Sequence, residues 1–219
     1  MTYAPRHWRN FVRDLSSQLP IAGVRPVILE SWMRSRAAGV DPASHSVLLR
    51  RVDQSDLARR LNANQGLLAA AEPVLRDFSK SLGRLQHAIY LADRDGIVLF
   101  STGTNQVMIA YGLMPGYDWS EVTMGTNGAG TALATGQPVA VLGPDHYQLP
   151  FHSATCLAAP LHSPNRQLVG AIDLSTSAVD ADPDQLRAVI DVARQIESSL
   201  RRTVPHITNS AQGNTELQV

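Results

Sequence analysis

The chain has 219 residues, of which 44% are hydrophobic and 17% charged, and its 19 basic and 19 acidic side chains balance. This composition indicates a globular protein with one sizeable core and excludes a disordered chain. A net charge of zero also argues against direct nucleic-acid binding, because no overall field attracts the chain to phosphate.

The sequence also bears on where the protein works. Its N-terminus lacks the apolar run of a secretory signal, and no stretch approaches the roughly 18 apolar residues that cross a bilayer. The single cysteine, Cys156, cannot form an internal disulfide, as expected in a reducing compartment. We therefore expect a cytoplasmic protein without membrane contact.

Residues 1–86 have the pattern of a helical region, because apolar side chains recur at helical spacing in four segments. Pro26 suits the first turn of the second helix. Asp53 or Ser55 can cap the third helix. Pro73 is expected to open the fourth helix, since proline is tolerated in a first turn.

After this region the pattern changes to strands. Residues 88–92 and 97–101 are expected to form a hairpin around a turn that contains Gly96. Three further strands are expected, at residues 138–142, 155–161 and 168–174. Short helices are expected between the hairpin and these strands, at residues 104–114 and after Asn127.

A long helix is expected from Asp182 onward, and the residues from 203 to 219 are polar and unpatterned. We expect one side of this helix to help form a homodimer with helices of residues 26–86, through Leu186, Val189, Ile196 and Leu200. The chain is therefore divided into a helical region (1–86), a mixed domain (87–202) and a polar tail (203–219).

The order of elements is helices, two strands, helices, three strands and a helix. Without regular βαβ alternation, it predicts an α+β protein with an antiparallel sheet covered by helices. The glycines between Gly125 and Gly130 follow a loop instead of a strand, which argues against a dinucleotide-binding fold. No GxxxxGK[ST] motif is present, so nothing indicates a nucleoside triphosphatase.

Several motifs occur in a recognisable order between residues 26 and 200. They are Ser31-Trp-Met-Arg-Ser-Arg-Ala-Ala-Gly39, Leu91-Ala-Asp-Arg-Asp-Gly96, Trp119-Ser-Glu121, Gly125-Thr-Asn127, His146-Tyr147, Cys156-Leu-Ala-Ala-Pro160 and Leu168-Val-Gly170-Ala-Ile-Asp-Leu174. This series resembles the N-terminal sensory region of acetoin-catabolism-type activators, which work with the sigma-54 polymerase.

The resemblance implies a GAF-like fold, with a central antiparallel sheet of about six strands, flanking helices and an N-terminal helical extension. It also implies a ligand pocket between the sheet and the variable loops. Activators of this type continue into an ATPase domain and a helix-turn-helix, which these 219 residues lack. We therefore expect a stand-alone sensory or regulatory protein that binds a small metabolite and passes the signal to a regulatory protein partner.

The expected ligand site comprises Trp119, Glu121, Thr126, Asn127, His146, Tyr147, Phe151, His152 and Cys156. Free amides at the start of the helix after Asn127 would suit an anionic or carbonyl-bearing ligand. The alternative is structural. Thr126 or Asn127 would cap that helix, and Gly128 and Gly130 would allow it to pack closely on the sheet.

His146, His152 and Cys156 could instead ligate a transition metal or a haem iron, which would make the protein a metal- or haem-dependent enzyme or gas sensor. On a regular strand, His152 and Cys156 would lie ~13 Å apart, so joint ligation requires a bend near Ser153. The favoured alternative places both histidines at the pocket mouth and Cys156 in the core. We expect a binding protein without catalytic activity, because one cysteine cannot complete a disulfide cycle.

Overall fold

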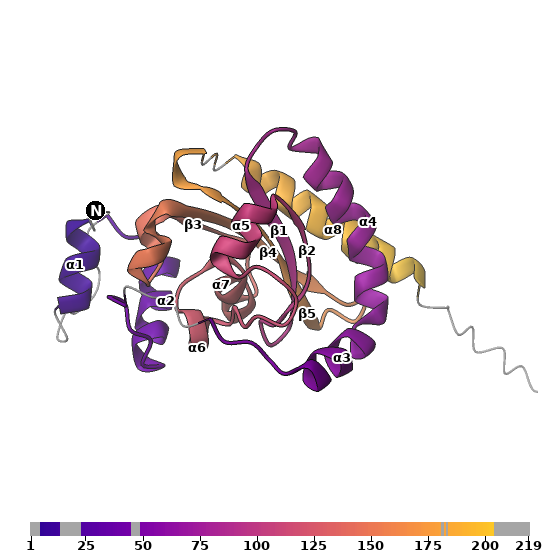
Figure 1. Cartoon of the computed structure of the whole chain (residues 1–219), viewed down its shortest axis with the longest axis horizontal. Helices are drawn as coiled ribbons and strands as arrows, with labels where there is room; N and C mark the ends of the chain where they lie inside the picture. Colours follow the sequence, from indigo (N-terminus) through magenta and orange to yellow (C-terminus); the bar gives the residue numbers. More distant parts are fainter. Residues whose placement is uncertain (1–4, 14–22, 45–48, 181, 183, 204–219) are drawn as a thin grey trace, which may run out of the picture.

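The chain folds as one antiparallel sheet with helices on both faces (Figure 1). This computed structural model describes residues 5–13, 23–44, 49–180, 182 and 184–203. The predicted tail therefore lies outside the described residues, apart from its first position.

The sheet has the strand order β2-β1-β5-β4-β3, and all neighbouring strands are antiparallel. The strands are β1 (His87–Asp93), β2 (Val98–Gly103), β3 (Val139–Leu142), β4 (Ala154–His162) and β5 (Leu168–Ser177). The predicted α+β class is confirmed, but the sheet has five strands instead of about six. Between β3 and β4 the chain forms two 3-10 turns, η1 (Gly143–Asp145) and η2 (Leu149–Ser153). Each turn contains a proline, which has no N–H for a sheet ladder.

Eight α-helices surround the sheet within the described residues. They are α1 (Arg6–Arg13), α2 (Pro26–Ala37), α3 (Gln54–Ala63), α4 (Gln65–Ser81), α5 (Asn105–Tyr111), α6 (Glu121–Met124), α7 (Gly128–Thr135) and α8 (Gln185–Thr203). Of the two predicted caps for α3, Asp53 is the N-cap, and its side chain accepts a hydrogen bond of 2.8 Å from the Asp56 amide.

The prediction that Pro73 opens a helix is wrong, because Pro73 lies inside α4. An interior proline removes one helical hydrogen bond and costs about 3 kcal/mol. Tertiary packing offsets this cost, since Leu67 on one side of the proline and Leu75 on the other are both buried against the sheet.

Alternate residues of β1, β3 and β4 face two separate cores. Tyr90 belongs to the core between the sheet and helices α1, α2 and α7, whereas Ile89 belongs to the core beneath α4 and α8. In Figure 1, α4 and α8 lie side by side, and α5 and α7 lie over the sheet. The sheet therefore separates an α7 side from an α8 side.

The predicted dimer face of α8 is used within the chain. Val189 and Ile196 are only 1% and 0% exposed, and they pack in the core formed with α4 and β4. Leu186 and Leu200 are partly buried against the same core. The prediction that this face of α8 forms a dimer contact is therefore wrong, since α4 covers the face in the same molecule.

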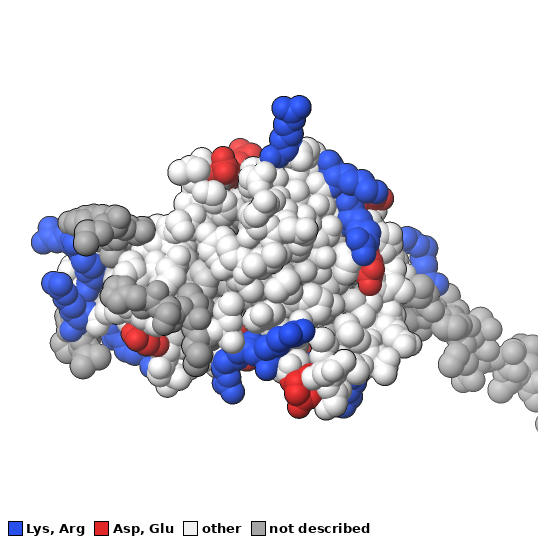
Figure 2. Space-filling model, in the orientation of Figure 1, with Lys and Arg blue, Asp and Glu red and all other residues white. Residues whose placement is uncertain are grey.

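The distribution of charged side chains on the surface agrees with the net charge of zero. On the face in Figure 2, basic and acidic side chains lie mainly toward the edges of a broad uncharged area, and no continuous basic patch is visible there. None of the helices in the described ranges has the length and apolar character to span a bilayer.

Candidate functional site

A cluster of polar side chains lies on the sheet beneath α7. Tyr90 of β1 pairs with Asp173 of β5, and Cys156 of β4 pairs with Ser175 of β5. All four side chains are buried. With His146, which contacts Cys156, they form what we call the polar cluster. It occupies a core that is otherwise largely apolar.

Hydrogen bonds fix the protonation of the imidazole and the thiol. His146 Nδ1 lies 2.8 Å from the Gly143 carbonyl oxygen, which can only accept, so Nδ1 carries the hydrogen. Its Nε2 lies 3.4 Å from Cys156 Sγ and accepts from the thiol. Burial lowers the pKa of His146 to about 4, and burial raises the pKa of Cys156 well above its usual value. The pair is therefore neutral, unlike the thiolate of a cysteine nucleophile.

Asp173 is a fully buried carboxyl group with one unpartnered oxygen. Its Oδ1 accepts a hydrogen bond of 2.7 Å from Ser175 Oγ, and Oδ2 has no partner. Burial raises the pKa of Asp173 to about 7, although the Ser175 hydroxyl and the Ala129 amide favour the ionised form. The hydroxyl of Tyr90, across the strand pair, also has no partner. Unpartnered buried polar atoms are rare in native proteins and mark candidate sites.

The first turn of α7 covers Asp173 directly. A Cβ on Gly128 would lie 1.8 Å from Asp173 Oδ2 and 2.7 Å from Cys156 Cβ, so only glycine fits. At Gly130, a Cβ would lie 2.7 Å from the Glu121 amide nitrogen. The predicted close packing on the sheet is confirmed for Gly128, whereas Gly130 packs against α6 and the residues before it instead of the sheet.

Asn127 caps α7, as the structural alternative predicts. Its Oδ1 accepts a hydrogen bond of 2.8 Å from the Gly130 amide, and its Nδ2 donates to the carbonyl oxygens of Gly125 and Trp119. Every polar atom of this side chain is engaged in positioning the turn. Asn127 therefore holds α7 over the polar cluster.

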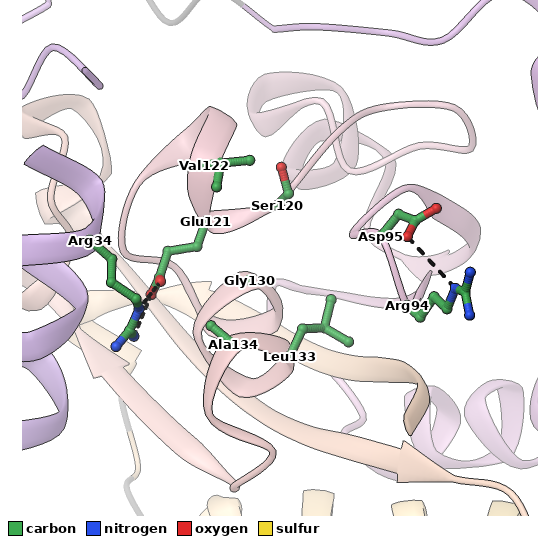
Figure 3. A pocket seen from close by; sticks show the side chains of 9 residues that line it. All are labelled: Arg34, Arg94, Asp95, Ser120, Glu121, Val122, Gly130, Leu133 and Ala134. Atoms are coloured by element: carbon green, nitrogen blue, oxygen red, sulfur yellow. Dashed lines mark hydrogen bonds and ion pairs between the residues drawn. The ribbon is translucent and has the colours of Figure 1, made fainter. Parts of the chain in front are cut away.

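Glu121 joins α6 and α7 to α2. Its carboxylate accepts a hydrogen bond from Arg34 Nε at 2.5 Å (Figure 3). It also accepts hydrogen bonds from Ser31 Oγ and from Thr131 Oγ1, the latter at 3.0 Å. Ser31 Oγ also lies 2.6 Å from Thr126 Oγ1. Two predicted ligand residues, Glu121 and Thr126, thus belong to a buried contact between helices, which we call the α2 latch.

A surface hollow of about 260 Å³ lies beside the α2 latch (Figure 3). It is lined by Arg34, Arg94, Asp95, Ser120, Glu121, Val122, Gly130, Leu133 and Ala134. Of the nine predicted ligand residues, only Glu121 lines this hollow, and its carboxylate is already paired.

The two predicted metal-binding histidines are enclosed instead of lying at a pocket mouth. His146 and His152 are 1% and 4% exposed. His152 lies in η2, before the start of β4, so the strand spacing to Cys156 does not apply. Its Nε2 lies 3.1 Å from the carbonyl oxygen of His146 and donates to it. The structure therefore brings His146 to Cys156 and directs His152 elsewhere.

This donor set does not fit a metal or a haem. Across the ranges that the structure describes, no three His, Cys, Asp or Glu side chains are grouped so that they could hold an ion. Both ring nitrogens of His146 are engaged, and Trp8 packs edge-on against His152 at 4.9 Å between ring centroids. A haem would require this packed region to open.

The predicted aromatic ligand residues are part of the core. Trp119 donates a hydrogen bond of 3.1 Å to the carbonyl oxygen of Gly112, and its ring lies 5.3 Å from that of Phe151. The ring of Tyr147 packs edge-on near Phe11. These side chains pack in the same core as the polar cluster.

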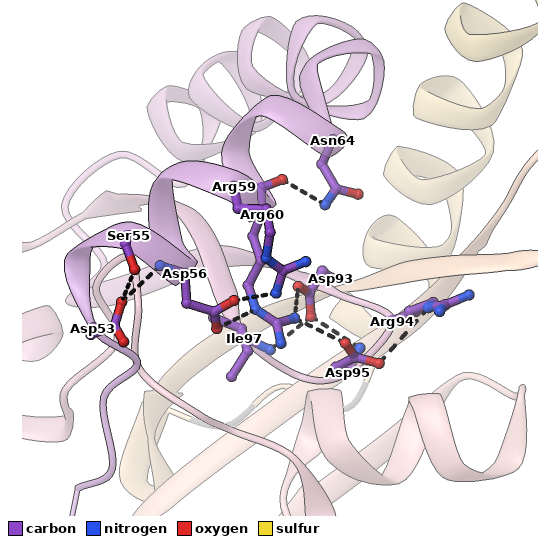
Figure 4. A network of polar contacts seen from close by, with 10 residues as sticks. All are labelled: Asp53, Ser55, Asp56, Arg59, Arg60, Asn64, Asp93, Arg94, Asp95 and Ile97. Atoms are coloured by element: carbon purple, nitrogen blue, oxygen red, sulfur yellow. Dashed lines mark hydrogen bonds and ion pairs between the residues drawn. The ribbon is translucent and has the colours of Figure 1, made fainter.

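A charged network lies away from this site, between α3 and the β1–β2 turn (Figure 4). Arg60 donates hydrogen bonds to Asp56, Asp93 and Asp95 over 2.7–2.9 Å. Burial alone would lower the pKa of Arg60, but these carboxylates raise it. Opposite charges pair across the network, so its evident role is to anchor α3.

The sequence analysis did not single out Tyr90, Asp173, Ser175, Ser31 or Arg34. One signal was available, since Asp173 is the only charged residue in the apolar strand segment 168–174. An acidic side chain within a strand of otherwise apolar residues must be buried, and a buried carboxyl group needs hydrogen-bond partners or an opposite charge.

Comparison with known proteins identifies the family. Residues 3–198 match the family described as MimR, N-terminal domain. The chain is 32% identical over 196 residues to the acetoin dehydrogenase operon transcriptional activator AcoR of Bacillus subtilis. It is 35% identical over 183 residues to the propane 2-monooxygenase operon transcriptional activator MimR of Mycolicibacterium goodii. These alignments cover 88% and 81% of this chain, but only 32% and 30% of the activators.

A solved structure supports the fold. The E. coli DhaR(N)-DhaL complex contains a chain that aligns with a TM-score of 0.77 and 20% identity, covering 81% of this chain and 61% of that one. The chain therefore belongs to the MimR N-terminal domain family and corresponds to the N-terminal sensory region of sigma-54-type transcriptional activators, as its motifs predicted.

Proposed function

We propose that this chain is a regulatory input domain that binds a small molecule at the polar cluster. One observation carries the proposal. Asp173 Oδ2 and the Tyr90 hydroxyl lack partners in the same core, beneath the first turn of α7. Each unpartnered buried group costs about 1–3 kcal/mol, which a ligand with matching polar groups would recover.

The fold offers a route by which occupancy would reach α2. Gly128, at the start of α7, touches Asp173, and Thr131 in the same helix donates to Glu121. Glu121 in turn holds Ser31 of α2. A ligand that lifts the start of α7 would strain the α2 latch, because one short helix contacts both sites. Ligand binding would thereby shift the position of α2.

The related activators support a small ligand. Their names refer to acetoin and propane, which are small and uncharged, and a small uncharged molecule suits a site without a free cation. Regulation of transcription would place the protein in the cytoplasm, as the sequence predicts. Homodimerisation and a protein partner stay predictions, and light scattering at micromolar concentration tests the first.

Thermal unfolding and saturation-transfer NMR with small oxygenated compounds test the proposal. We expect at least one compound to raise the unfolding temperature and to contact the protein. Thr155→Val is a matched control, because Thr155 is also buried with an unpartnered hydroxyl but lies on the α8 side. Ligand effects that vanish in this control but persist in Asp173→Asn would refute the proposed site.

A further inference from the structure

We propose that Ser79, activated by His87, is a nucleophile that takes an acyl group from small activated esters. The two side chains meet between the last turn of α4 and the first residue of β1. Ile89, two positions after His87, belongs to the core beneath α4 and α8, so the pair lies on the α8 side of the sheet. The activity would therefore be independent of the polar cluster on the other side.

The hydrogen bonds of His87 leave one ring nitrogen available as a base. Its Nδ1 lies 2.7 Å from the carbonyl oxygen of Leu85, which can only accept, so Nδ1 carries the hydrogen. In the uncharged ring, Nε2 then has a lone pair, and it lies 2.8 Å from Ser79 Oγ. A nucleophile, a base in contact with it and a third group that orients the base are the signature of nucleophilic catalysis.

The backbone of His87 is held as firmly as its ring. Its carbonyl oxygen accepts a hydrogen bond of 2.7 Å from the Thr104 amide, and its own amide donates to Thr104 Oγ1 at 3.3 Å. A Cβ on Gly103 would lie 2.4 Å from the same carbonyl oxygen, so only glycine lets the end of β2 approach this closely. The imidazole is thus fixed in one orientation toward Ser79, which lowers the entropic cost of proton transfer.

Ser79 differs in its partner from other serines on the helices. Ser35 and Ser81 donate to backbone carbonyl oxygens of their own helices, as helical serines commonly do. Ser79 instead contacts an imidazole nitrogen, and its side chain is only partly buried. Its Oγ is therefore both paired with a base and open to a reagent from solution.

Both side chains line a surface hollow of about 590 Å³, which is large enough for a small ester. Arg84 lines the same hollow and is exposed. Attack on a carbonyl carbon places a negative charge on the carbonyl oxygen, and a nearby guanidinium stabilises that charge. The hollow therefore combines a nucleophile, a base and a cation suited to the oxyanion.

The reaction would proceed in two steps. Ser79 Oγ attacks the ester carbonyl carbon while its proton passes to His87 Nε2, and the imidazolium returns this proton to the departing alcohol. The acyl group remains on Oγ as a new ester. Water then attacks that ester with His87 again as the base, so that a carboxylic acid leaves and the serine is restored.

The group behind the imidazole limits the range of substrates. In a serine triad a carboxylate stabilises the imidazolium that forms during attack. Here the carbonyl oxygen of Leu85 occupies that position, and it carries only a partial negative charge. The pair therefore suits activated esters, whose alcohols leave readily, and not amides.

Hydrolysis of para-nitrophenyl acetate by the purified chain tests the proposal. We expect a burst of about one equivalent of nitrophenol and then slow turnover, because the acetyl group stays on Ser79 until water removes it. Peptide mass spectrometry after the burst should locate the acetyl group on Ser79. Ser79→Ala and His87→Gln should each lower the rate about 100-fold. Ser81→Ala, which changes an exposed serine of the same helix, should keep the native rate.

Ser79→Ala provides the decisive result, because alanine is the best helix former and the variant is expected to fold, as circular dichroism would verify. A native burst in this variant, or an acetyl group on Lys80 or Ser81 with Ser79 unmodified, would overturn the proposal. A native rate in folded His87→Gln would do the same, since glutamine can accept the serine hydrogen bond but cannot take the proton. Nitrophenol release no faster than in buffer alone would also refute it, without bearing on the polar cluster.

Discussion

Replacing Asp173 with asparagine should remove a pH-dependent cost from the folded state. The carboxyl is fully buried, and its pKa is raised by burial from 3.8 to about 7. The folded protein therefore holds this proton more tightly than the unfolded chain. The stability that the protonated group contributes is present below about pH 4 and is lost as the pH rises toward 7.

The size of the effect follows from the shift. A change of about three pKa units corresponds to about 4 kcal/mol, since each unit is worth about 1.4 kcal/mol. Asparagine keeps an oxygen that can accept from Ser175 but does not titrate. Relative to the native protein, Asp173→Asn should therefore gain about 4 kcal/mol between pH 4 and pH 8, a large part of a typical domain stability.

The informative quantity is the difference in unfolding free energy between Asp173→Asn and the native protein, because other groups titrate in the same pH range. Burial lowers the pKa values of His146 and His152 to about 4. Their contribution is present above pH 6.5 and is lost as the pH falls toward 4, which opposes the trend of Asp173. Both histidines remain in the variant, so their effects cancel on subtraction.

Urea unfolding monitored by tryptophan fluorescence would measure both proteins from pH 4 to pH 8. Trp8, Trp32 and Trp119 are buried in the core on the α7 side and report its loss. Asp191→Asn is a control, because Asp191 is an exposed acid paired with Arg194 on α8. A difference between Asp173→Asn and the native protein that stays constant across this range would refute the buried-carboxyl reasoning.

Four further substitutions test the packing and the networks. Gly128→Ala should destabilise the fold by about 3 kcal/mol through overpacking. Gly66→Ala, which has open space around it, should stabilise α4 by about 0.5 kcal/mol. Urea midpoints equal to that of the native protein would contradict both expectations. Glu121→Gln should cost about 2 kcal/mol and speed hydrogen exchange in α2, and unchanged exchange there would exclude the latch. Arg60→Met should cost about 2 kcal/mol and expose α3 to proteolysis, and native-like resistance would contradict its anchoring role.

Local chemistry explains why so much of the fold could be predicted from the sequence. Strand periodicity located the hairpin of β1 and β2, and helix-capping preferences located Asp53 and Asn127. These signals depend on neighbouring residues alone. Pro73 was misassigned because its helix is stabilised by a sheet that lies later in the chain. The α8 face was misassigned for the same reason, since α4 covers it.

The candidate site was less predictable because it depends on strand register. Tyr90 and Asp173 are 83 positions apart, and only the pairing of β1 with β5 makes them neighbours. The roles of His146 and His152 depended on η1 and η2, two short turns without periodicity. The sequence indicated chemistry near Cys156 but could not show that its imidazole partner would be neutral.

Tyr90→Phe separates a functional role of the polar cluster from a structural one. The tyrosine hydroxyl is buried without a partner, so its removal should stabilise the free protein by about 1 kcal/mol. The same change should weaken the binding of any small molecule that occupies the polar cluster, as saturation-transfer NMR would show. Stability and binding would thus move in opposite directions, as expected where a site retains polar groups at the expense of stability. If urea unfolding instead shows that Tyr90→Phe destabilises the protein, the hydroxyl has a structural partner and its assignment to ligand recognition is wrong.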